Sequence, residues 1–167
     1  MSLRGDLFAR KPATAQVPIV LDRAAYDAAA QAVDEAAQVL AEEQGRGAWD
    51  LDAERARLAA ARAALGEIPV RIVTLRALPP DVWDEMIEAH PPTEEQAARG
   101  AQWNNKTHRL PCVAASVVTP DDEEPMTVAD WEMLAKGGHI TDGELNRLYE
   151  AAVVLNGRSP QVSTGKG

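Results

Sequence analysis

Apolar and polar positions divide the chain into two strand-like segments, a long helical stretch between them, and a series of shorter helices. Residues 17–21 and 68–75 are short and rich in β-branched side chains, which is typical of strands. Over residues 22–44, apolar side chains recur every three or four positions, and over residues 51–65 leucine recurs every seven positions. Both spacings predict amphipathic helices.

The two long helices are expected to form an antiparallel hairpin. Asp22 can cap the first helix, Gly45 and Gly47 can end it, and Gly66 can end the second. The short connection and the heptad spacing of the leucines favour coiled-coil-like contact between them. Because the side chains expected between the two helices are mostly alanine, the hairpin alone would be only marginally stable. The strand-like segments on either side are candidates for pairing with each other, which would make the hairpin an insertion between two strands.

Residues 79–157 are predicted to fold into a compact set of short helices. Pro79 and Pro80 can open the first one, because proline is tolerated in the first turn of a helix. Three later helices are predicted from capping patterns at residues 93–96, 127–130 and 141–144.

The segment around Pro111 has two interpretations. Residues 104–107 are predicted to form a turn, and Pro111 is predicted to begin a helix over residues 112–118. Three valines in that segment leave a strand open as the alternative.

The whole chain is expected to be mainly α, with an Ala-rich antiparallel hairpin, a two-stranded β element flanking it, and a bundle of short helices. A length of 167 residues is enough to bury a core without disulfides. Much of the 46% apolar share is alanine, which favours close helix packing. The expected regions are a flexible arm over 1–16, the hairpin with a strand pair over 17–78, a compact helical domain over 79–157, and a disordered tail over 158–167.

The net charge of −9 narrows the range of partners. An acidic chain opposes binding to nucleic acid or to anionic membranes, where a basic surface supplies the affinity, so neither is expected as a partner. No apolar run approaches membrane-spanning length, and the segment after Met1 lacks the apolar core of a signal peptide. The cytoplasm is therefore the expected compartment.

No constellation of residues in the sequence predicts catalysis, a cofactor or a metal site. Cys112 is the single cysteine, and none of the histidines has a second His or Cys at metal-ligand spacing. A nucleophilic pair of Cys112 with His108 is disfavoured by Pro111 between them, so we interpret Cys112 as a buried structural residue. Glycine-rich phosphate loops are also missing from the sequence. We therefore expect a protein that is not an enzyme and that acts by binding. The histidines are His90, His108 and His139.

Large side chains of the predicted helical domain are the candidates for partner contact. Trp83 and Ile87 share an apolar helical stripe with His90. Tryptophan is enriched at interface hot spots, although a tryptophan early in a capped helix more often anchors a core. The candidate partner-binding residues are Trp83, Ile87, Trp103, Trp131, Leu148 and Tyr149.

Several segments follow one another in an order that points to one protein family. A short strand and a charged, Ala-rich hairpin precede residues 78–92, which contain the sequences LPPDVW and EAHPP. The sequences WEML at residues 131–134 and GELNRLY at residues 143–149 belong to the two closing helices. In these features the chain resembles the tail assembly chaperones of long-tailed, siphovirus-type phages and prophages of actinobacterial hosts. The stretch HRLP at residues 108–111 departs from the Phe-Pro-Pro that this resemblance leads us to expect there.

The resemblance implies a protein that binds the tape measure protein and tail tube subunits during tail assembly. It implies action in the cytoplasm of the bacterial host and absence from the mature virion. A longer form of the protein, made by ribosomal frameshifting, is also implied, and the pair Gly165 and Lys166 is compatible with a slippery site. Two other classes stay open: a structural head–tail or tail completion protein retained in the virion, and an acidic helical regulatory binding protein.

Overall fold

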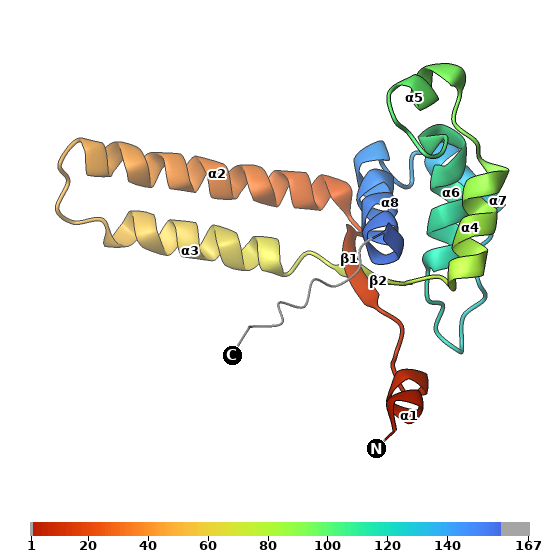
Figure 1. The fold of residues 1–167 in the computed structure, drawn as a ribbon. Helices are drawn as coiled ribbons and strands as arrows, with labels where there is room; N and C mark the ends of the chain where they lie inside the picture. The colour runs from red at the N-terminus through yellow and green to blue at the C-terminus, as the bar shows by residue number, and fades with distance from the viewer. Residues whose placement is uncertain (1, 158–167) are drawn as a thin grey trace, which may run out of the picture. The chain divides into compact units, whose positions relative to one another are not determined.

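The structure, a computed structural model, describes residues 2–157. The expected tail over residues 158–167, with Gly165 and Lys166, lies outside the described residues. Over the described part, eight helices and a two-stranded antiparallel sheet confirm the expected mainly α class (Figure 1). In chain order the elements are α1 (Leu3–Phe8), β1 (Thr14–Val20), α2 (Arg23–Gly45), α3 (Asp52–Gly66), β2 (Val70–Arg76), α4 (Pro80–Ala89), α5 (Glu94–Ala98), α6 (Asn105–Ser116), α7 (Val128–Lys136) and α8 (Asp142–Gly157).

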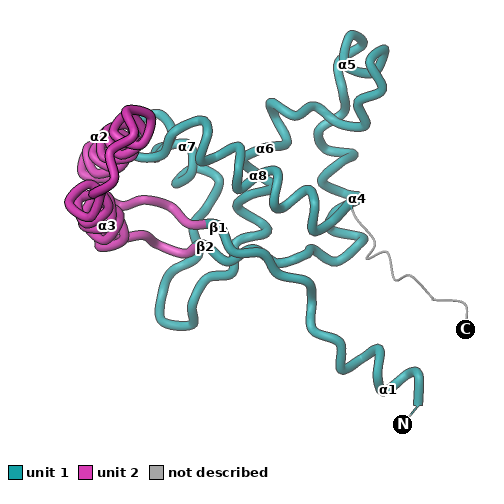
Figure 2. Tube along the Cα trace, turned by 90° about the vertical axis from the view of Figure 1, so that its left-hand side faces the viewer, with its two compact units in different colours: residues 1–17, 73–167 teal, residues 18–72 magenta. Residues whose placement is uncertain are grey.

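The chain divides into two compact units (Figure 2). The hairpin unit is Pro18–Ile72, and the helical unit is Met1–Val17 together with Val73–Gly167. The boundary therefore passes through both strands, whereas the sequence suggested a boundary after residue 78. The segment expected to be a flexible arm contains α1 and the start of β1. α1 buries none of its residues.

β1 and β2 are the two strand-like segments of the sequence, and they pair with each other. At one end of the ladder the N–H of Leu21 donates to the carbonyl of Pro69 at 3.1 Å. At the other end the N–H of Ala77 donates to the carbonyl of Ala13 at 2.8 Å. The hairpin is thus inserted between two paired strands. β1 begins at Thr14, three residues before the start expected from the sequence.

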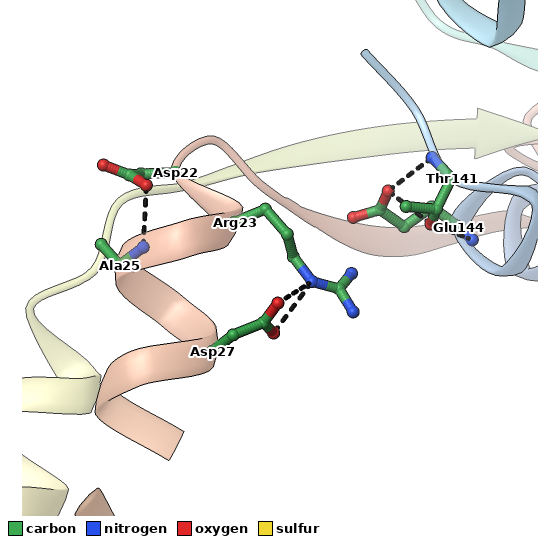
Figure 3. A network of polar contacts seen from close by, with 6 residues as sticks. All are labelled: Asp22, Arg23, Ala25, Asp27, Thr141 and Glu144. Carbon is green, nitrogen blue, oxygen red and sulfur yellow. Dashed lines mark hydrogen bonds and ion pairs between the residues drawn. The ribbon is translucent and has the colours of Figure 1, made fainter. Parts of the chain in front are cut away.

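α2 and α3 lie side by side and form the antiparallel hairpin (Figure 1). The side chain of Asp22 caps α2 by accepting a hydrogen bond from the N–H of Ala25 at 2.9 Å, as expected (Figure 3). Ala36 of α2 and Leu58 of α3 are the residues that these helices bury. Most of the surface of the two helices is consequently open to solvent.

The chain reverses at the tip of the hairpin through a Schellman motif. Gly47 has a φ of 78°, and its N–H donates to the carbonyl of Gln44 at 3.0 Å. The N–H of Ala48 donates to the carbonyl of Glu43 at 3.0 Å. These two bonds satisfy carbonyls at the C-terminal end of α2 and fix the course of the turn.

α6 corrects the interpretation of the segment around Pro111. The helix begins after Asn104, whose side chain accepts a hydrogen bond from the N–H of Lys106 at 3.1 Å, and it continues through Pro111. The predicted turn is therefore the first turn of this helix, and Pro111 lies inside it. The strand alternative holds only at Val117, which forms an isolated bridge with Leu75.

Burial explains why α6 tolerates an internal proline. A proline inside a helix removes one hydrogen bond and costs about 3 kcal/mol. α6 packs on both α7 and α8, and apolar burial stabilises by about 25 cal/mol per Å². One face of the helix is completely covered, and it consists of His108, Cys112, Val113 and Ser116.

The three predicted capping patterns of the helical unit are present as hydrogen-bonded capping boxes. Thr93 and Gln96 cap α5, and Thr127 and Asp130 cap α7. Before α8, the N–H of Glu144 donates to Thr141 Oγ1 at 3.2 Å, and the N–H of Thr141 donates to Glu144 Oε2 at 2.9 Å (Figure 3). The core of the helical unit, where α6 packs on α7 and α8, includes Leu75, Trp131, Ile140, Leu145, Leu148 and Ala152.

The Schellman motif predicts opposite effects of one substitution at two glycines. Gly47→Ala places a side chain on a left-handed residue and destabilises the hairpin by about 1–2 kcal/mol. Gly45→Ala stabilises it by about 0.5–1 kcal/mol, because Gly45 is the last residue of α2 and an added Cβ meets nothing within 4 Å. Hydrogen exchange of the α2 and α3 amides measures both changes. Shifts of the same sign would contradict the motif.

Candidate functional site

The structure separates the six candidate contact residues into two groups. Trp131 is 4% exposed, Leu148 is fully buried and Tyr149 is 7% exposed, so these three side chains belong to the core, and of the three only Tyr149 also lines a groove at the surface. The other three are half-buried and keep part of their surface open: Trp83, Ile87 and Trp103.

Trp83, Trp103 and Tyr149 gather around the buried His108. The ring centroid of His108 lies 5.3 Å from that of Trp83 and 5.3 Å from that of Trp103. The Tyr149 ring is 5.7 Å away, and His90 at the end of α4 is 5.9 Å away. We call these five residues the aromatic cluster. All of these pairs except that of His108 with Trp103 meet edge to face, and aromatic pairs contribute about 0.5–1.5 kcal/mol each beyond their buried area, so the cluster ties α4, α6 and α8 together.

The Tyr149 hydroxyl is the centre of a hydrogen-bond network inside the aromatic cluster. It accepts a hydrogen bond from Trp103 Nε1 at 2.6 Å and donates one to Asn105 Oδ1 at 3.1 Å. His108 Nδ1 lies 3.2 Å from the same oxygen. When the hydroxyl gives its one proton to Asn105, the tautomer that completes the network has the imidazole proton on Nδ1, which then donates to Tyr149.

The buried position of His108 keeps its imidazole neutral. Burial lowers the pKa of His108 to about 4, and the neighbouring His90 lowers it as well. Protonation would add a second N–H at Nε2, which has no hydrogen-bond partner among the described residues. A charged imidazole at this place would therefore be both desolvated and only partly hydrogen-bonded, and the neutral form is strongly favoured.

Cys112 lies one helical turn after His108, but the pair does not have the properties of a nucleophile and its base. The thiol is completely buried, and burial raises the pKa of Cys112 to about 12. At neutral pH the thiol is protonated, whereas a reactive cysteine needs a lowered pKa and access to solvent. His108, with its lowered pKa, is a poor proton acceptor. Both residues act in the structure as core side chains.

A groove of about 460 Å³ lies beside the aromatic cluster along α8. Its walls combine the rings of Trp103 and Tyr149 with the amide of Asn105. On α8 itself, Asn146 Nδ2 donates to Glu150 Oε1 at 2.7 Å. The groove can receive an apolar side chain and a polar group of a partner. Its remaining lining residues are Asn146, Glu150, Val153 and Val154.

Trp49 is a candidate contact residue that sequence reasoning missed. It follows the Schellman motif at the tip of the hairpin, and it is 99% exposed. The signal was present in the sequence, because a tryptophan two residues after Gly47 in a short turn has no apolar stripe to join. A fully exposed indole is unusual in a folded protein and is enriched where partners bind.

Among residues 2–157, no group of three or more His, Cys, Asp or Glu side chains is placed to hold a metal ion. In the same part of the chain, no helix has both the length and the apolar character that crossing a bilayer requires. Comparison with protein-family models, with curated proteins and with solved structures gives no significant match.

The lowered pKa of His108 predicts a loss of stability in mild acid. The unfolded chain binds a proton near pH 6.5 and the folded chain only near pH 4, so stability falls as the pH drops through this window. The full loss at about pH 4 is on the order of 3 kcal/mol. Urea unfolding at a series of pH values measures it.

Two variants isolate the contribution of His108 to this pH dependence. His108→Phe keeps an aromatic ring in the cluster but cannot titrate, so the slope of stability against pH between 4 and 6.5 should flatten whatever its absolute stability. His139→Gln, at an exposed position after α7, should leave the slope unchanged. An unchanged slope in His108→Phe would refute the assignment.

The raised pKa of Cys112 predicts a thiol that alkylating agents barely attack. A shift from 9 to about 12 reduces the thiolate fraction at neutral pH roughly a thousand-fold, and burial slows the reaction further. Iodoacetamide labelling followed by mass spectrometry should therefore show modification in urea and almost none in buffer. Rapid labelling of the native protein would show that Cys112 is activated.

Proposed function

We propose that this protein is a tail assembly chaperone of a long-tailed phage or prophage. It binds the tape measure protein and tail tube subunits by surface contact during tail assembly, and it catalyses no reaction. It works in the cytoplasm of the bacterial host and is absent from the mature virion. The resemblance of its sequence features to such chaperones supports this proposal, and so does one exposed helix face.

That face is a row of small residues on α3, and it is the observation that carries the proposal. Ala53, Ala56, Ala60 and Ala63 recur at three- and four-residue spacing, and all four are exposed. At 3.6 residues per turn, the row lies on the side of α3 opposite the buried Leu58, which faces α2. We call these four residues the alanine seam.

The alanine seam suits a helical partner. The distance between two packed helix axes depends on the side chains at the contact, so alanine lets a partner helix approach closely. An amphipathic helix can then lie along α3 with its own apolar stripe against the seam. In the family that this chain resembles, the tape measure is a long helical protein, and it would offer many such stripes.

The charge of the chain fits the same role. A chaperone must expose apolar surface without aggregating itself, which requires a charged body around the exposed surface. The net charge of −9 supplies this, and Asp52 and Arg57 border the alanine seam on the helix surface. Within the helical unit, the groove along α8 offers a second contact surface for a partner side chain.

Co-expression with the tape measure protein tests the proposal. The wild-type chain should co-purify with the tape measure and keep it soluble. Ala60→Arg places a long charged side chain in the middle of the alanine seam, and it should reduce recovery of the complex at least ten-fold. Arginine is a good helix former, so α3 itself should persist, as far-UV circular dichroism can verify.

Ala41→Arg is the matched control for Ala60→Arg. It makes the same substitution at an exposed position of α2, and it should leave the complex intact. Equal loss of binding in both variants would show that added charge, and not the seam, matters. Failure to recover a complex with both proteins soluble would count against the chaperone role, as would detection of this chain in purified virions by mass spectrometry.

A further inference from the structure

Trp49 at the hairpin tip sits in an acidic segment. From Glu42 to Glu54 the chain carries five carboxylates and one arginine, Arg46. Arg46 is engaged with Glu43 at 2.6 Å, and Arg55, directly after this segment, is engaged with Asp52 at 3.4 Å. The Schellman motif orders the backbone just before Trp49, so the indole is presented from a defined turn. The tip therefore offers a large apolar group with negative charge around it.

The helical unit contains a groove with the complementary character. It has a volume of about 540 Å³, which lies in the range of pockets that enclose ligand-sized groups. Three basic side chains line it, in a chain whose net charge is −9. Within residues 2–157, Arg10, Lys11 and Arg76 take part in no ion pair. We call this the basic groove, and its apolar lining includes Leu7, Pro12, Leu78, Pro79 and Leu155.

Hydrogen bonds hold the walls of the basic groove together. The N–H of Ala77 donates to the carbonyl of Ala13 at 2.8 Å, which joins the segment before β1 to the segment after β2. The N–H of Leu78 donates to Asn156 Oδ1 at 2.7 Å, which joins the same wall to α8. The groove is thus built from three segments of one unit and does not depend on a single loop.

We propose that the basic groove receives the Trp49 tip of a second copy of this chain. The indole contacts the apolar lining, Arg10 and Arg76 can stack on its face, and the carboxylate of Asp50 lies against the cations. The residues that follow Gly157 are a poorer occupant by charge, because they include Arg158 and Lys166 and no carboxylate side chain.

Such a contact is heterologous, because the tip of one copy meets a different surface on the next. A row of copies therefore ends in a free tip on one terminal copy and a free groove on the other. Further copies can add at either end, or the two ends can join to close a ring. This inference concerns the chain alone and needs no phage partner. Its test is therefore independent of the chaperone role proposed above.

Sedimentation velocity of the purified full chain tests the contact. At low salt the weight-average sedimentation coefficient should rise with protein concentration. At high salt the coefficient should be lower at the same protein concentration, because charge pairs contribute to the contact and salt screens them. Trp49→Ala and the double variant Lys11→Glu/Arg76→Glu should each remain monomeric under the same conditions. Met133→Ala, at a residue 63% exposed on α7, and Lys106→Glu, an exposed charge reversal outside the groove, should assemble like the wild type.

Mixing the two defective variants gives the decisive result. Trp49→Ala keeps an intact basic groove and the double variant keeps an intact tip, so an equimolar mixture has one functional junction and should form dimers but nothing larger. Dimer formation would also show that the basic groove is folded in Trp49→Ala and that the tip is folded in the double variant. A wild-type chain that stays monomeric, assembly that survives either variant, or a mixture that stays monomeric would each overturn the proposal.

Discussion

The burial of one face of α6 against α7 and α8 is the interaction on which the helical unit depends. It keeps α6 helical through Pro111, although a proline at that position removes a backbone hydrogen bond. It also carries His108 beneath Tyr149, where the imidazole is neutral and hydrogen-bonded. The interface therefore combines apolar packing with a polar contact and avoids burying a charge, which would be far more costly.

The sequence predicts those helices and strands whose signals lie within a few residues. It does not predict an element whose structure depends on contacts with residues far along the chain. Asp22 and Thr141 cap helices through atoms three residues away, so a short stretch of sequence is enough to locate these helix starts. α6 is different, because the burial that outweighs Pro111 comes from helices that lie further along the chain. The register of β1 with β2 likewise depends on two segments separated by the whole hairpin, and composition could only make them candidates.

The candidate contact residues show the same limit. Trp131 is buried and Trp49 is almost fully exposed, although both are tryptophans near the start of a helix or in the turn before one. Residue type alone therefore does not separate an anchor of the core from a surface anchor. The difference lies in what packs over each side chain, as α6 does near Trp131, and only the tertiary structure supplies that information.

The hydrogen bond between Leu21 and Pro69 places the two ends of the hairpin on neighbouring strands, roughly 4.8 Å apart. An inserted segment whose ends meet in this way can change its length at the far end without disturbing its base. Removing or adding one heptad on each helix would move the turn by roughly 10 Å and leave the strand register as it is. Natural variation can therefore change the length of the α2–α3 hairpin without changing how the rest of the molecule folds.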